Sequence, residues 1–200
     1  MENDPRNKNK IKIVALDFDG VITNLKVDWK CAIRLASQIT GYDIKSLLTF
    51  YETSHDTPIF CLVSKEIEKI ELEALKSAEP TPFLDEFLDK ILKANAEICL
   101  VSMQSALVIK TFLTRHDLAR YFKEILTRER FSSKKTQVEY ILNFSGVKPE
   151  EVLLVDDLKR SLEQCKELGI RCFHFKGHKD LSTTRKMWHR ICEIVHSNNV

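Results

Sequence analysis

The chain has 200 residues, of which 44% are hydrophobic and 30% are charged, and its formal net charge is +2. These values are ordinary for a soluble globular protein and exclude a chain that is disordered throughout. The charge balance argues against a nucleic-acid partner. No stretch approaches the roughly eighteen consecutive apolar residues of a membrane-spanning helix. The length predicts one domain, or one domain with a sizeable insertion.

Two features of the sequence bear on its cellular location. Residues 1–10 are polar and lack the apolar run of a secretory signal, so we expect a disordered tail there. The six cysteines are scattered and form no C-x-x-C pair. Buried, reduced thiols in a cytoplasmic protein explain this distribution better than disulfides or a zinc site.

Five short apolar runs predict the strands of a sheet. They are partly β-branched and do not alternate with polar residues, which is typical of strands buried on both faces of a parallel sheet. The runs cover residues 11–16, 98–101, 125–126, 152–155 and 170–175.

Helical patterns alternate with these runs. Apolar residues recur at helical spacing over residues 83–92, 106–113, 138–142, 158–168 and 187–195. Gly169 is a natural left-handed end for the fourth of these helices. The alternation predicts an α/β fold, with a Rossmann-like parallel sheet flanked by helices.

The stretch between the first two strands is too long for a simple crossover. Residues 25–81 have their own helical periodicity and end in the charged helix SKEIEKIELEALKSAE. We therefore predict an α/β core formed by residues 11–24 and 82–200, with residues 25–81 inserted as a small helical subdomain.

The first strand leads directly into Asp17-Phe18-Asp19-Gly20. Side chains two residues apart on an extended chain point to the same side, so Asp17 and Asp19 are expected to project together from the end of the strand. Ligands of open α/β sheets bind at this edge, where two carboxylates repel each other unless a cation or a shared proton relieves them. On its own, the motif could equally be a pair of solvated turn aspartates.

Three further groups of polar residues lie at strand ends or helix starts. Ser102 follows the second strand, Lys134 and Lys135 precede a helix, and Asp156 and Asp157 end the fourth strand. Each group has an ordinary alternative: a helix-capping serine, a solvated basic turn and an acidic turn. Their occurrence in this order, each at such a position, favours one common site.

The segments DFDGVITN, ICLVS, SSKKTQVEYIL and VLLVDD together resemble the four-motif signature of the haloacid dehalogenase-like phosphohydrolases. The resemblance covers residues 11–175. The insertion falls where members of the phosphoglycolate phosphatase and β-phosphoglucomutase group carry a helical cap, and we call residues 25–81 the cap. The resemblance implies a Mg²⁺-dependent phosphatase that hydrolyses a small phosphorylated metabolite through an aspartyl-phosphate intermediate.

The resemblance also implies roles for individual residues. Asp17 matches the nucleophile, and Asp19 matches the general acid and base. Ser102 and the backbone N–H of Met103 match the groups that bind the phosphate. Members that cleave carbon–halogen bonds lack the second aspartate, so the presence of Asp19 disfavours dehalogenation.

The metal ligands and the phosphate-binding lysine follow in the same way. Asp17, Asp19 through its backbone carbonyl, and Asp157 match the groups that hold Mg²⁺. Lys134 matches the phosphate-binding lysine, with Lys135 as the alternative. Carboxylates and a phosphate dianion cannot share a pocket without compensating charge, which independently requires a divalent cation.

Some assignments remain open on the sequence. Asp156 is either a metal ligand or an outer contact. Ser161 stands where many relatives carry an acidic residue, which bears on metal affinity. A phosphomutase of the same fold and a catalytically idle binding or regulatory protein are the alternatives to a phosphatase, and a monomer or weak homodimer is expected.

The cap offers four polar candidates for contact with the leaving group of the substrate. These are Arg34, His55, Asp56 and Lys65. For each of them, a solvated position on a helix or loop is the stronger interpretation. A cap of this size favours small phosphorylated metabolites over proteins or nucleic acids.

Overall fold

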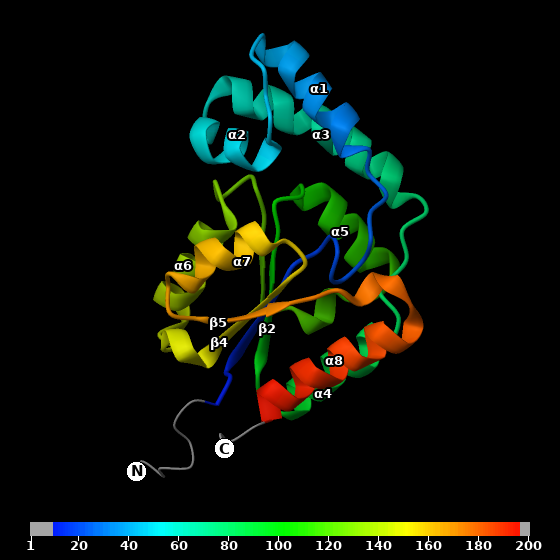
Figure 1. Cartoon of the computed structure of the whole chain (residues 1–200), viewed down its shortest axis with the longest axis vertical. Helices are drawn as coiled ribbons and strands as arrows, with labels where there is room; N and C mark the ends of the chain where they lie inside the picture. The colour runs from blue at the N-terminus through cyan, green and yellow to red at the C-terminus, as the bar shows by residue number, and fades with distance from the viewer. Residues whose placement is uncertain (1–9, 197–200) are drawn as a thin grey trace.

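The computed structural model describes residues 10–196, so the predicted tail lies outside the described residues except for Lys10. Within that range, the chain forms a parallel five-stranded sheet of order β3-β2-β1-β4-β5 (Figure 1). The predicted α/β fold is confirmed. The strands are β1 (Ile13–Leu16), β2 (Glu97–Val101), β3 (Glu124–Leu126), β4 (Val152–Asp156) and β5 (Arg171–His174).

Helices cover both faces of the sheet. Val14 and Leu16 point into the hydrophobic cluster that α4, α5 and α8 share, whereas Ile13 and Ala15 point into the cluster on the side of α6 and α7. The bounds are α4 (Leu84–Lys93), α5 (Ala106–Arg115), α6 (Lys134–Ser145), α7 (Lys159–Lys166) and α8 (Leu181–His196). Short 3₁₀ helices span Ala119–Tyr121, Pro149–Glu151 and Gly177–Lys179.

The predicted C-terminal helix packs back onto the core. Trp188 of α8 lies between the rings of Phe87 and Phe175, with centroid distances of 4.3 and 4.4 Å, and its indole N–H donates to the carbonyl of Pro82. Helix α7 ends at Lys166, earlier than predicted, but Gly169 has the expected positive φ of 77°.

No helix within residues 10–196 combines the length and the apolar character that crossing a bilayer requires. All six cysteines are free. Cys99 and Cys165 are buried as expected, whereas Cys31 and Cys61 of the cap are exposed.

The cap helices pack on one another and sit over the carboxyl ends of the strands (Figure 1). They are α1 (Trp29–Thr40), α2 (Leu47–Ser54) and α3 (Pro58–Leu75). Asp28, Ser46 and Thr57 each accept a backbone N–H of the first turn, so every cap helix begins at a side-chain cap. This local chemistry fixes where the three helices start.

The two segments that join the cap to the core run side by side. The Thr23 hydroxyl donates to the carbonyl of Glu79 at 2.8 Å, and the Thr81 hydroxyl donates to the carbonyl of Val21 at 2.6 Å. Threonine side chains therefore tie the entry and exit of the cap together at the surface of the core.

A buried arginine holds α3 against the core. Arg128 follows β3 and is fully buried. Its guanidinium donates to the hydroxyl and the carbonyl of Ser64, to Glu71 Oε1 at 2.6 Å, and to the carbonyl of Met103. It also lies 5.5 Å from the ring centroid of Tyr51. One core side chain therefore contacts two cap helices.

A second, more exposed group of contacts joins α2 to α7. Arg160 donates to Thr49 Oγ1 and to Glu52 Oε2, both at 2.9 Å. Gln164 donates to the other oxygen of Glu52 at 3.1 Å. The cap is thus held against the core on two sides.

The buried pair generates a stability prediction. We expect Arg128→Met to lower the free energy of unfolding by about 3–5 kcal/mol, because it leaves the Glu71 carboxylate and the polar groups of Ser64 buried without their partner. Lys123→Met removes the exposed pair with Glu97 and is expected to cost less than about 1 kcal/mol. Urea unfolding followed by tryptophan fluorescence compares the two variants. Equal losses in both variants would contradict the role given to Arg128.

Candidate active site

Asp17 and Asp19 lie at the carboxyl end of β1 and line the same cavity. The Asp17 N–H donates to the carbonyl of Val155, which continues the pairing of β1 with β4 by one residue. Asp19 Oδ1 accepts the N–H of Leu25 at 2.7 Å. The Asp17 carboxylate in turn accepts the N–H of Phe18 at 2.8 Å, so backbone N–H groups hold both carboxylates.

Gly20 allows this turn to approach the fourth strand. Its φ is +87°, and a Cβ added there would lie 2.2 Å from Cγ of Asp157. Any other residue would be strained and would displace the Asp157 carboxylate. The glycine thus brings the first and fourth motifs together.

The structure distinguishes the two candidate lysines. Ser133 caps α6, so Lys134 is the first residue of that helix. Its Nζ lies 2.5 Å from Asp17 Oδ1, 2.7 Å from the carbonyl of Val101 and 3.3 Å from Asp156 Oδ2. Lys135 instead pairs with Glu167 at the surface. Lys134 is therefore the lysine beside the first aspartate.

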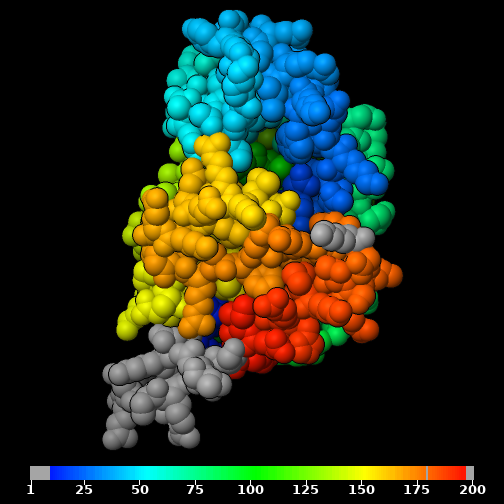
Figure 2. Space-filling view, in the orientation of Figure 1, coloured from blue at the N-terminus to red at the C-terminus, as the bar shows by residue number. Residues whose placement is uncertain are grey.

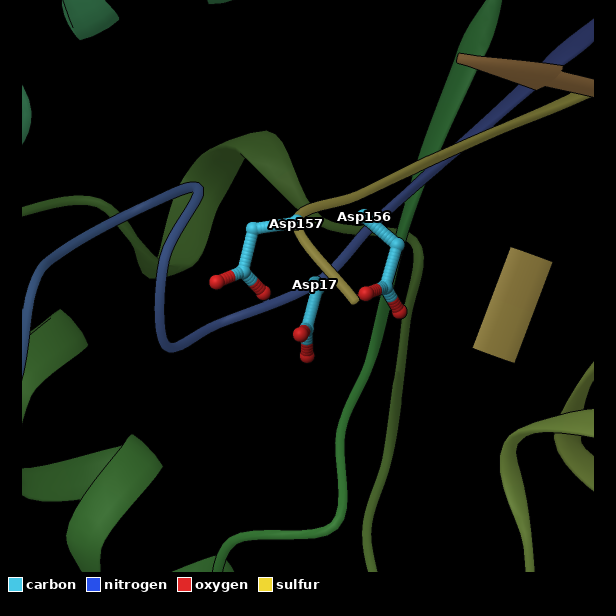
Figure 3. Close-up of side chains that lie close together, drawn as sticks. All are labelled: Asp17, Asp156 and Asp157. Atoms are coloured by element: carbon cyan, nitrogen blue, oxygen red, sulfur yellow. The ribbon is translucent and has the colours of Figure 1, made fainter. Parts of the chain in front are cut away.

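Three carboxylates form a cluster that could hold a metal ion. Asp17, Asp156 and Asp157 each offer an oxygen, and these oxygens all lie within 4.8 Å of one another. Figure 3 shows the three side chains pointing into one region from β1 and from the end of β4. Asp156 Oδ1 accepts the N–H of Leu158, whereas its buried Oδ2 accepts no hydrogen bond within residues 10–196 and only lies 3.3 Å from the Lys134 ammonium. Asp156, left open by the sequence, belongs to this cluster.

Burial and mutual repulsion shift the pKa values of these groups. Burial raises the pKa of Asp17, against the opposing charge of Lys134. Burial and the charge of Asp156 raise the pKa of Asp157 to about 6. Burial, aided by Asp157, raises the pKa of Asp19 to about 7, which suits a group that gives and takes a proton near neutrality.

The residues after β2 close another side of the site. The Ser102 hydroxyl donates to the side-chain oxygen of Gln104, and its carbonyl accepts the amide of Gln137 at 2.7 Å. Ser102 is fully buried, whereas Met103 and Gln104 line the cavity. Gln104 is a lining residue that the sequence analysis did not single out.

The cavity between the core and the cap has a volume of about 520 Å³. Figure 2 shows the surface hollowed at this junction. None of the four polar cap candidates lines it; His55 Nε2 instead contacts the carbonyl of Arg128 at 3.0 Å, and the other three are exposed at least in part. The sequence analysis singled out none of the cap residues that do line it and form the cap wall, which are Leu25, Val27, Trp29, Ile33, Lys45, Ser46, Leu47, Leu48, Tyr51 and Glu71.

Two features of the sequence could have identified a residue of this wall, Glu71, and its partner Arg128. Glu71 falls on the stripe of α3 that includes the buried residues Phe60, Val63 and Ile67, so a charged residue stands where the helix pattern calls for an apolar one. Arg128 follows β3 at the carboxyl edge of the sheet, where functional residues gather. Both signals lie in the printed sequence.

The chain is similar to known proteins over most of its length. The model of the haloacid dehalogenase-like hydrolase family matches residues 14–175. A phosphoglycolate phosphatase of Aliivibrio fischeri is 22% identical over 191 residues, covering 82% of this chain and 83% of that protein. One of Vibrio parahaemolyticus is 23% identical over 188 residues, covering 82% of each.

Solved structures have the same fold. A haloacid dehalogenase-like family hydrolase from Xanthomonas campestris superposes with a TM-score of 0.62 at 14% identity, covering 96% of this chain and 95% of that one. A haloacid dehalogenase-like family protein from Streptococcus pneumoniae gives a TM-score of 0.59 at 14% identity, covering 88% and 90%. With the family model matching well over half of its residues, this chain belongs to the haloacid dehalogenase-like hydrolases.

Proposed function

We propose that this protein is a Mg²⁺-dependent phosphatase that hydrolyses a small phosphorylated metabolite. The observation that carries the proposal is the meeting of Asp17, Lys134, Asp156 and Asp157 at the carboxyl edge of the sheet, where Asp17 and Asp157 line the cavity between core and cap. The names of the phosphoglycolate phosphatases to which the chain is similar support the same reaction class.

The proposed first step uses the two aspartates that follow β1. The Asp17 carboxylate attacks phosphorus and forms an aspartyl-phosphate, while the bond from phosphorus to the leaving oxygen breaks. Asp19 gives its proton to that oxygen, so the alcohol leaves neutral. A raised pKa keeps this proton on Asp19 near neutral pH.

The proposed second step regenerates the enzyme. Asp19, now ionised, takes a proton from a water molecule whose oxygen attacks the phosphorus of the aspartyl-phosphate. The bond between phosphorus and Asp17 breaks, which releases inorganic phosphate. Lys134 offsets negative charge on the phosphoryl group in both steps, and the backbone N–H of Met103 and the hydroxyl of Ser102 are proposed to orient it.

The acidic cluster fits a divalent cation. Three carboxylates face a single buried ammonium, so two negative charges are uncompensated when all are ionised, and hard oxygen ligands are those that Mg²⁺ prefers. Asp17, Asp156 and Asp157 would hold the ion, with the backbone carbonyl of Asp19 as a further ligand. A bound Mg²⁺ would offset the charge of the transferring phosphoryl group.

The first prediction from this proposed function concerns the nucleophile. Asp17→Asn is expected to reduce hydrolysis of acetyl phosphate to background, because an amide cannot form the aspartyl-phosphate. Asp19→Asn is expected to lower kcat by about 10²–10⁴-fold through loss of proton transfer. Asp85→Asn, an exposed aspartate in the first turn of α4, is the matched control and should retain full activity. Phosphate release measures all three, and activity of Asp17→Asn equal to wild type would refute the proposal.

The second prediction concerns the metal. A chelator is expected to abolish activity and added Mg²⁺ to restore it. Asp157→Asn should raise the Mg²⁺ concentration for half-maximal activity, and we expect a change of at least about tenfold. Mg²⁺ should also raise the Tm of the wild type but not that of the variant, because an ion that binds only the folded state stabilises it. An unchanged Mg²⁺ requirement in Asp157→Asn would exclude it as a ligand.

A further inference from the structure

The cavity has two chemically different ends. Its core end carries Asp17, Asp19 and Asp157, where the phosphoryl group is proposed to bind. Its cap end is walled mainly by Trp29 and Ile33 of α1 and Leu47 and Leu48 of α2, with Lys45 and Ser46 just before α2. A volume of about 520 Å³ exceeds what a phosphoryl group fills and lies within the range of small-molecule sites. The cap end therefore has room for the leaving group.

The cap end lacks a buried cation that could receive a carboxylate. Among the described residues that line the cavity, Lys45 is the only lysine and there is no arginine. The Lys45 side chain is 82% exposed, and its Nζ lies 2.5 Å from Asp43. A substrate carboxylate placed against the apolar wall would lose its water without gaining a buried counter-charge, which is unfavourable.

Arg128 lies close to the cavity but does not fill this role. Its guanidinium is fully buried, and four of its five N–H groups are donated to Ser64, Glu71 and Met103. Glu71, which does line the cavity, is the partner of this arginine. The pair is internally neutral and presents no positive charge to a ligand.

One polar group at the cap end has no partner. Tyr51 lines the cavity and is 2% exposed, and its hydroxyl makes no hydrogen bond within the described part of the chain. A buried hydroxyl without a partner is costly, so a ligand that supplies a donor or an acceptor there is favoured. The site therefore suits a leaving group that is apolar apart from one neutral polar group.

We propose that the substrates are phosphate monoesters of uncharged alcohols whose carbon skeleton packs on Trp29, Ile33 and Leu48. A hydroxyl or carbonyl group of the substrate bonds to Tyr51. Phosphoglycolate, with its small carboxylated leaving group, is then a poor substrate. This inference rests on the proposed phosphatase function and specifies its substrate class.

The test compares kcat/KM for methyl phosphate, n-butyl phosphate and phosphoglycolate, whose leaving groups are all alkyl alcohols. We expect n-butyl phosphate to exceed the other two by at least about tenfold, because each buried carbon adds transition-state binding in an apolar pocket. A higher value for phosphoglycolate, or equal values for all three, would overturn the inference.

Acetyl phosphate separates this outcome from failure of the chemistry. If the wild type hydrolyses acetyl phosphate no faster than Asp17→Asn does, the phosphatase proposal itself fails. If acetyl phosphate is hydrolysed and phosphoglycolate is still preferred to n-butyl phosphate, only the substrate class is wrong.

A charged substitution in the apolar wall tests the role of that wall directly. Leu48→Arg is expected to lower kcat/KM for n-butyl phosphate about tenfold and to raise it for phosphoglycolate, because an arginine can pair with the carboxylate. Leu62→Arg is the matched control, since Leu62 is 50% exposed on α3 and does not line the cavity. The same change of preference in both variants would contradict the assignment of the wall.

Tyr51→Phe tests the neutral polar contact. In the wild type, we expect 4-hydroxybutyl phosphate to match or exceed n-butyl phosphate. In the variant, the ratio of the two kcat/KM values should fall, with n-butyl phosphate itself little changed. A ratio that stays the same would remove Tyr51 from the proposed site.

Discussion

Repulsion among carboxylates at one edge of the sheet is the constraint on which the rest of the structure depends. Asp17, Asp156 and Asp157 lie within reach of one another, and only the Lys134 ammonium forms an ion pair with this cluster in the part of the chain that the structure describes. Burial strengthens the repulsion because charges interact more strongly in a medium of low dielectric constant. The first turn of α6 fixes the lysine, and Gly20 admits the third carboxylate. The negative charge that remains is the charge that a bound cation would offset.

A buried ion pair, Arg128 with Glu71, lies on the cap side of the cavity. Arg128 belongs to the core and Glu71 belongs to the cap, and both side chains are buried. Such a pair is costly to form and more costly to break, since removing one partner leaves the other uncompensated. It therefore holds the cap on the core more strongly than the exposed contacts of Arg160 do. The same bonding leaves the guanidinium no free charge to offer a ligand, because Glu71 already neutralises it.

The sequence predicted the parts of the site that short segments determine. The point where an apolar run stops marks the end of a strand. The predicted positions of Asp17 and Asp157 at strand ends followed from these runs. The choice of Lys134 came from a family pattern, and the cap by Ser133 explains it physically. The cap wall could not be predicted in this way. An apolar residue such as Leu48 has the same periodicity whether it faces a neighbouring helix or an open cavity, and only the packing of the cap on the core distinguishes the two.

The core end of the cavity could be predicted from the sequence and the cap end could not. This difference has a physical basis. At the core end, the pairing of β1 with β2 and β4 fixes the side chains, and a shift of one residue would turn every carboxylate to the other face. Few sequences satisfy that requirement, which is consistent with a family model that matches residues 14–175 although the two phosphoglycolate phosphatases are only 22% and 23% identical. At the cap end, helices need only bury an apolar stripe, and many side chains suffice. Membership of the family therefore constrains the phosphoryl chemistry closely, whereas the leaving group must be inferred from the wall that this particular cap presents.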